Sequence, residues 1–214
     1  MEVTLKICRF DPEEDILPYF QEFPVSVEGS QTVLDSLLLA WQQDPTLSFR
    51  RSCRSAICGS CAVRINGQPA LACQTLISKA TEDGGAITIE PLPHFRQLKD
   101  LVVDLEPFFA SLRATIPWLI LREDYEGWMS PEIARQLESP ATCILCGLCQ
   151  AALGETEEIK PATLVKALRL SQDPRDALGM HRIRLMQVPA EVLQLFLRRL
   201  PEKCPKGIKI TVAA

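Results

Sequence analysis

The residues best suited to chemistry in this sequence are its nine cysteines. An odd number of cysteines does not pair completely into disulfides within one chain. The sequence also opens without the basic-then-apolar arrangement of an export signal, and a protein that stays where it is made keeps its thiols reduced. Closely spaced reduced cysteines in such a protein usually bind metal.

Four of the cysteines have the spacing C-x4-C-x2-C-x11-C, namely Cys53, Cys58, Cys61 and Cys73. The first three match the plant-type ferredoxins, in which four thiolates hold a [2Fe–2S] cluster. The dipeptide Asn66-Gly67 lies between two apolar segments and predicts a two-residue hairpin turn with φ > 0 at both positions. Counting back from this turn puts Cys73 opposite Ser60 and beside Cys61. The predicted hairpin therefore delivers the fourth ligand.

The residues around this group support the same prediction. Gly59 lets the backbone bend closely around a cluster, because it has no Cβ to clash. Three arginines flank the ligands, Arg50, Arg51 and Arg54. Cations near a negatively charged cluster favour its reduced form; equally, these arginines could solvate the loop or pair across an interface. A zinc site is the alternative, but zinc usually takes two separated C-x2-C pairs.

A second group has the spacing C-x2-C-x2-C, at Cys143, Cys146 and Cys149. In bacterial ferredoxins this run continues with x3-C-P, and that last cysteine ligates the other cluster. Here Leu153-Gly154 stands at that position, whereas Cys204-Pro205 occurs farther along. The sequence predicts one [4Fe–4S] cluster, on Cys143, Cys146, Cys149 and Cys204. The alternative is three cysteines on a helix face with Cys204 merely nearby.

Apolar spacing predicts the elements that must position these ligands. Residues 3–7 alternate as a half-buried strand, and further strands are expected at 24–27, 62–65 and 86–90. A helix with apolar positions from 33 to 41 begins with a capping box of Thr32 and Asp35. Strands mixed with one good helix predict a compact α+β domain over residues 1–96.

Beyond residue 96 the apolar period becomes helical. A stripe from Leu98 to Leu112 predicts a helix, which Pro107 must kink or restart. Later helices are expected around residues 164–168 and from residue 190 to a stop before Pro201. The second domain, residues 97–214, is therefore predicted to be all-α.

Several function classes are disfavoured. The net charge is −4 and no dense Lys/Arg run suggests nucleic acid. The longest apolar stretches, at 37–41 and 117–121, are far shorter than the ~20 residues that span a bilayer. No Ser/His/Asp or paired-carboxylate arrangement suggests a catalytic residue.

Cys8 is expected to be an inert, partly buried thiol. We expect a cytoplasmic protein, held at the inner face of the membrane, if at all, by partner subunits.

Six short motifs resemble the iron–sulfur subunit of succinate dehydrogenase and fumarate reductase: R-S-C-R at 51–54, I-C-G-S-C at 57–61, L-A-C at 71–73, D-L-V-V-D at 100–104, C-I-L-C at 143–146 and C-P-K-G at 204–207. The resemblance runs from the first strand to about Lys206. It implies a β-grasp ferredoxin-like domain followed by an α-helical ferredoxin domain. It also implies a partner flavoprotein with covalently bound FAD, where succinate and fumarate interconvert.

The resemblance also implies a difference. The family normally holds a third cluster, [3Fe–4S], beside a quinone site, on the Cys-Pro of the first run and on two cysteines of a C-H-x-I-x-x-C segment. Here Leu153, Met180 and Met186 stand at those positions. Thioethers do not replace thiolates on iron–sulfur clusters, so no [3Fe–4S] cluster is expected. His181, near that cluster in the family, is expected to have a packing or surface role.

The expected function is therefore an electron relay from partner FAD through [2Fe–2S] and [4Fe–4S] to a further acceptor, or the reverse. Without a third cluster, the [4Fe–4S] cluster is expected to face a partner other than the usual membrane anchor. One alternative is a relay for a different flavin dehydrogenase with a non-quinone acceptor. Another is a scaffold with structural zinc in both cysteine groups. The sequence encodes no substrate pocket, so it does not identify the substrate of the partner flavoprotein.

Overall fold

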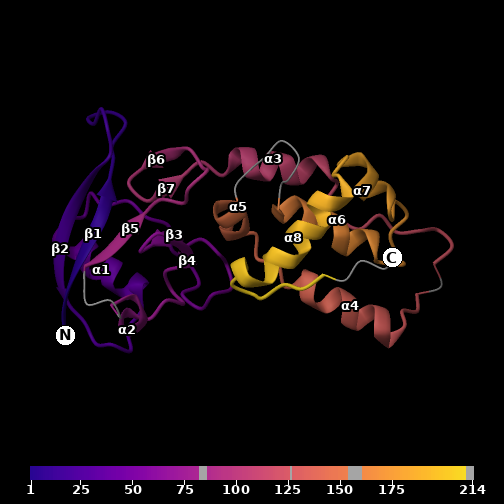
Figure 1. Cartoon of the computed structure of the whole chain (residues 1–214), viewed down its shortest axis with the longest axis horizontal. Helices are drawn as coiled ribbons and strands as arrows, with labels where there is room; N and C mark the ends of the chain where they lie inside the picture. Colours follow the sequence, from indigo (N-terminus) through magenta and orange to yellow (C-terminus); the bar gives the residue numbers. More distant parts are fainter. Residues whose placement is uncertain (82–85, 126, 154–160, 211–214) are drawn as a thin grey trace. The chain divides into compact units, whose positions relative to one another are not determined.

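The computed structural model in Figure 1 describes residues 1–81, 86–125, 127–153 and 161–210. It divides into two compact units, Met1–Leu105 and Glu106–Ala214. Within the described residues, no helix has both the length and the apolar character needed to cross a membrane.

The first unit is built on a five-stranded sheet with the order β2-β1-β5-β3-β4. Its strands are β1 (Glu2–Arg9), β2 (Tyr19–Ser26), β3 (Ala62–Ile65), β4 (Gln68–Leu71) and β5 (Ile87–Glu90). The central pair, β1 and β5, is parallel, and the other neighbouring strands are antiparallel. Helix α1 (Val33–Gln43) and the short helix α2 (Ile77–Ala80) complete the unit. This arrangement confirms the predicted α+β class.

Local sequence signals explain most of this unit. The apolar residues of β1 alternate, and Val3, Leu5 and Ile7 are buried while the residues between them are not. The capping box is present at the start of α1. Thr32 accepts from the backbone N–H of Asp35 at 3.3 Å, and the Asp35 carboxylate accepts from that of Thr32 at 2.9 Å.

The helix predicted from Leu98 is wrong over its first part. Residues 97–103 form a small antiparallel pair, β6 (Gln97–Lys99) and β7 (Val102–Val103), and the turn between them holds Asp100 at a φ of 44°. The buried Asp100 carboxylate accepts from the backbone N–H of Phe10 at 3.0 Å and of Ser48 at 2.7 Å. These distant partners hold the segment against the first unit.

The division between units consequently falls after Leu105, later than the boundary predicted after residue 96. The next helix, α3 (Glu106–Ala114), begins one residue before Pro107. A proline is tolerated there, because the first turn of a helix has no internal acceptor for its N–H.

The second unit is helical, as predicted. After α3 come α4 (Pro131–Ala141), α5 (Leu148–Leu153), α6 (Pro161–Ser171), α7 (His181–Leu185) and α8 (Ala190–Lys203). Its apolar core joins α6, α8 and the segment after α8, through Leu164, Val165, Leu168, Phe196, Leu200 and Ile208. The predicted stop before Pro201 is wrong, because α8 continues to Lys203 and the Cys204 N–H donates to the Leu200 carbonyl at 2.9 Å.

Candidate iron–sulfur sites

The hairpin predicted to deliver Cys73 is present. Asn66 and Gly67 have φ values of 47° and 79°, and Ile65 pairs with Gln68. The pairing extends beyond the strands, because the Ala72 N–H donates to the Cys61 carbonyl at 3.0 Å. The next residue, Cys73, is therefore placed beside Cys61.

Pro69 lies in β4, which is the edge strand of the sheet. A proline cannot donate to a central ladder, so the edge is where it is tolerated. The edge position of β4 therefore accommodates Pro69.

The loop from Arg50 to Cys61 wraps backbone N–H groups around the sulfur atoms. Cys53 Sγ accepts from three of them, those of Ser55, Ile57 and Cys58, at 3.4, 3.4 and 3.2 Å. Cys73 Sγ accepts from the Ala56 N–H at 3.3 Å. Such donors stabilise negative charge on sulfur, which is what thiolate ligands of a cluster carry.

This wrapping requires an unusual backbone. Gly59 has a φ of 72°, and two residues with side chains also adopt positive φ, Arg54 at 59° and Ala56 at 57°. Each L-residue in this region costs about 1–2 kcal/mol. Gly59 was identified from the sequence, whereas nothing in the residue types marks the other two positions.

The thiol groups of the four cysteines influence one another, Cys53 through Cys58, and Cys61 through Cys73 and, more weakly, Cys58. Four neighbouring thiol groups are the donor set that a [2Fe–2S] cluster requires. Among the residues that the structure describes, no group of three or more Cys, His, Asp and Glu side chains is placed to hold a single metal ion.

Cys53 and Cys61 differ in their electrostatic surroundings. Backbone N–H groups, that of Ser55 first, lower the pKa of Cys53 to about 6. Burial raises the pKa of Cys61 to about 12. In addition, Cys58 Sγ lies 3.1 Å from Ser60 Oγ, so a thiolate at Cys58 can accept a hydrogen bond from the Ser60 hydroxyl.

Two of the flanking arginines have partners within the first unit. Arg50 donates to the Val103 carbonyl at 2.7 Å. The Arg51 guanidinium carbon lies 5.2 Å from the ring centroids of both Trp41 and Phe49, which is cation–π geometry. Arg51 is thereby fixed two residues before Cys53.

The cysteines of the second group line one recess in the second unit, together with Val165, Leu200 and Ile208. Three of them, Cys143, Cys149 and Cys204, also pack against the apolar core. The loop turns sharply through positive φ at Leu145 (54°) and Gly147 (77°). Cys204 follows the end of α8 and lines the same recess. The distant Cys-Pro and the C-x2-C-x2-C run therefore lie side by side.

Burial dominates this second site. It raises the pKa of Cys143 and Cys149, and it raises the pKa of Cys146 to about 11. Thiolates in such a buried place need cations next to the sulfur atoms, and the iron ions of a cluster would supply that positive charge. The donor set and its apolar surroundings therefore fit an iron–sulfur cluster.

The remaining singled-out residues have other environments. Cys8 is buried, and its sulfur lies 3.7 Å from Gln97 Nε2. Because burial raises the pKa of the Cys8 thiol, Cys8 is a neutral thiol. Met180 is 48% exposed, whereas Met186 packs against the apolar core of the second unit. His181 begins α7 and is exposed. Gly154 lies outside the described residues.

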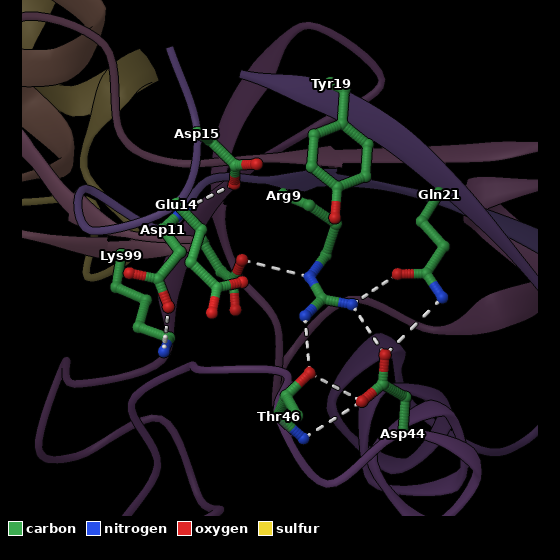
Figure 2. A pocket seen from close by; sticks show the side chains of 10 residues that line it. Arg9, Asp11, Glu14, Asp15, Tyr19, Gln21, Asp44, Thr46 and Lys99 are labelled. Atoms are coloured by element: carbon green, nitrogen blue, oxygen red, sulfur yellow. Dashed lines mark hydrogen bonds and ion pairs between the residues drawn. The ribbon is translucent and has the colours of Figure 1, made fainter. Parts of the chain in front are cut away.

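The sequence analysis missed a buried ion pair network at the end of β1, shown in Figure 2. Arg9 pairs with Asp44 at 2.9 Å and with Asp100 at 3.0 Å. It could have been found, because Arg9 continues the inward alternation of Val3, Leu5 and Ile7. A charged side chain at a buried strand position requires a buried partner.

A second missed pair lies in the second unit. The side chains of Arg182 and Asp176 are both 0% exposed and 2.6 Å apart. Arg182 also donates to the backbone carbonyls of Thr115 and Trp118, each at 2.9 Å, and to that of Ile116. It thus ties the segment after α3 to α7, and no residue type nearby signals this.

Comparison with known proteins identifies a [2Fe–2S]-binding domain in the first half of the chain. Residues 4–110 match the family described as "2Fe-2S iron-sulfur cluster binding domain". The chain is 36% identical to a mitochondrial succinate dehydrogenase [ubiquinone] iron-sulfur subunit of Oryza sativa subsp. japonica, covering 96% of this chain and 77% of that protein. It is 34% identical to the fumarate reductase iron-sulfur subunit of Haemophilus influenzae, covering 96% and 88%.

A solved structure gives the same result. A chain of the Mycobacterium smegmatis Sdh1 complex in the apo form superposes with a TM-score of 0.82 at 27% identity, covering 100% of this chain and 92% of that one. Fold and cysteine groups define an electron-transfer protein with a [2Fe–2S]-binding domain. The chain belongs to the family of iron–sulfur subunits of succinate dehydrogenase and fumarate reductase, which confirms the family inferred from the motifs.

Proposed function

We propose that this chain relays electrons between a FAD-containing dehydrogenase or reductase subunit and a further partner, through two clusters. The [2Fe–2S] cluster would take Cys53, Cys58, Cys61 and Cys73, and the [4Fe–4S] cluster would take Cys143, Cys146, Cys149 and Cys204. The observation that carries the proposal is the gathering of each group of four, one by the Asn66-Gly67 hairpin and one in the recess at the end of α8.

The chain's own residues would hold and tune these groups. The clusters, when bound, supply the one-electron carriers that link a flavin to an acceptor. Backbone N–H groups of the 50–61 loop stabilise thiolate charge at the first site. Val165, Leu200 and Ile208 exclude water from the second.

We further infer that the chain holds no [3Fe–4S] cluster. The three positions that correspond to its ligands in the family are Leu153, Met180 and Met186, and none of these side chains supplies a thiolate. The packing of Met186 against the apolar core supports a structural role for it. The relay would then meet its further partner at the [4Fe–4S] cluster, and direct quinone reduction at a third cluster would not occur.

EPR spectroscopy of anaerobically purified protein tests the proposal. Reduced protein should give signals from two centres, and oxidised protein should lack the signal of a [3Fe–4S] cluster. Cys204→Ala should abolish the [4Fe–4S] signal and spare the [2Fe–2S] signal, and Cys8→Ala, a buried cysteine outside both groups, should spare both. Equal loss of both signals in Cys204→Ala, or a colourless protein with stoichiometric zinc, would overturn the proposal.

A further inference from the structure

One end of the first unit displays apolar side chains to solvent. The β1–β2 turn, residues 10–18, connects the first two strands. Within it, Ile16 is 95% exposed and Leu17 is 74% exposed. The first two residues of β2, Tyr19 and Phe20, are also nearly half exposed. Large apolar side chains grouped in this way mark an interaction surface, whereas single ones do not.

The turn that carries these side chains is closed by its own hydrogen bonds. The Asp11 carbonyl accepts from the backbone N–H of Asp15 at 2.7 Å and of Glu14 at 3.1 Å. The Asp15 carboxylate accepts from the Asp11 N–H at 2.7 Å, and Lys99 pairs with Asp11 at 2.5 Å. A turn held in this way is preorganised, so a partner that binds it loses little conformational freedom.

The surroundings of the turn are acidic. A pocket of about 500 Å³ lies beside it (Figure 2), lined by five carboxylates but only two cations, Arg9 and Lys99. Arg9 is already held by Asp44 and Asp100, and Lys99 by Asp11. Negative charge therefore dominates, and the exposed Glu13 adds to it.

The same turn is connected to the loop of the first cluster site. The Asp100 carboxylate accepts from the backbone N–H of Phe10, at the base of the turn, and from that of Ser48. Ser48 lies two residues before Arg50, where the cysteine loop begins. A partner seated on the turn would therefore bind the end of the first unit that holds the [2Fe–2S] ligands.

We propose that the β1–β2 turn is a docking element for the flavoprotein subunit. That subunit would receive Ile16 and Leu17 in an apolar recess with Lys or Arg side chains around it, one of which reaches the acidic pocket. The inference rests on the proposed function, because the flavin is the group that exchanges electrons with the [2Fe–2S] cluster. A symmetric contact between the turns of two copies of this chain is disfavoured, since two acidic turns repel. An anionic membrane surface repels the turn as well.

The test is purification of the complex through an affinity tag on this chain, in the organism that makes it. The readout is flavin absorbance per [2Fe–2S] EPR signal. Ile16→Asp combined with Leu17→Asp should lower this ratio about tenfold or more, as expected when an apolar anchor is removed. The matched control is Leu195→Asp, which charges a 53% exposed leucine of α8 and should leave the ratio unchanged.

Charge is tested separately. Glu14→Lys should lower the flavin ratio and make it more sensitive to salt, whereas Glu28→Lys, beyond the other end of β2, should do neither. The double variant Ile16→Asp with Leu17→Asp could fail to fold, which loss of the [2Fe–2S] signal would reveal. In that case the milder double variant Ile16→Ser with Leu17→Ser gives the same test.

The outcomes separate the two ideas. A wild-type chain that binds flavoprotein and a turn variant that binds it equally well would overturn the docking site alone. An equal loss in Leu195→Asp would also contradict it, since the effect would not be specific to the turn. A wild-type chain that brings no flavin would overturn the proposed function together with the docking site.

Discussion

The two cysteine sites hold their sulfur atoms by opposite means. In the first, Cys53 and Cys58 are exposed, and backbone N–H groups donate to the sulfur atoms of Cys53 and Cys73. In the second, the cysteines line an apolar recess against the core of a helical unit. The first site depends on local backbone geometry and the second on tertiary packing. The two sites should therefore be sensitive to different substitutions.

The largest expected contrast is in thiol reactivity after the metal is removed. In the metal-free chain at pH 7, iodoacetamide should alkylate Cys53 well before Cys146. A pKa of about 6 leaves Cys53 mostly thiolate, whereas a pKa of about 11 keeps Cys146 protonated. Mass spectrometry of tryptic peptides gives the rates.

The pH dependence adds a second check. The Cys53 rate should be half-maximal near pH 6, level off about one pH unit above it, and approach a tenfold fall per pH unit well below it. Denatured protein is the control, in which both cysteines should react alike. Equal rates in the folded metal-free chain would remove the contrast between an exposed, hydrogen-bonded site and a buried one.

The next largest effect concerns the fold of the second unit. Arg182→Met should destabilise it by about 3–5 kcal/mol, because Asp176 is left charged and buried without its partner. The [4Fe–4S] EPR signal should weaken, and the [2Fe–2S] signal should persist. Thermal unfolding followed by circular dichroism gives the stability.

The control for this variant is Arg184→Met, which changes an exposed arginine of the same short helix. It should unfold like the wild type. A loss of the [2Fe–2S] signal in Arg182→Met as large as that of the [4Fe–4S] signal would contradict the independence of the two sites.

The same division explains what the sequence could and could not predict. The Asn66-Gly67 turn and the Thr32 capping box depend on residues a few positions apart, and both were found. The prediction of a helix from Leu98 was wrong over its first part, because the Asp100 carboxylate accepts hydrogen bonds from the backbone N–H groups of Phe10 and Ser48. The spacing of apolar residues does not reveal hydrogen-bond partners that lie so far away along the chain.

The candidate sites follow the same rule. Spacing and one turn predicted that the four cysteines of the first group lie together, and the proline after Cys204 marked it as the fourth member of the second group; their roles as cluster ligands stay predictions. The positive φ at Arg54 and Ala56 could not be foreseen, because it follows from wrapping N–H groups around sulfur. Arg182 was also missed, since its carbonyl acceptors are backbone atoms that every residue has.

The smallest expected effect tests whether side chains as well as backbone tune the first site. Arg51→Gln should lower the [2Fe–2S] midpoint potential by roughly 20–40 mV, because a cation held near the cluster favours the reduced form. The [4Fe–4S] potential, set in the other unit, is the internal control in the same EPR redox titration. Arg51→Lys keeps the charge but not the planar stack on Trp41 and Phe49, so its potential should fall between the two. A glutamine variant with wild-type potential would mean that Arg51 only stabilises the loop, and that the N–H groups around Cys53 and Cys73 tune the first site without side-chain charge.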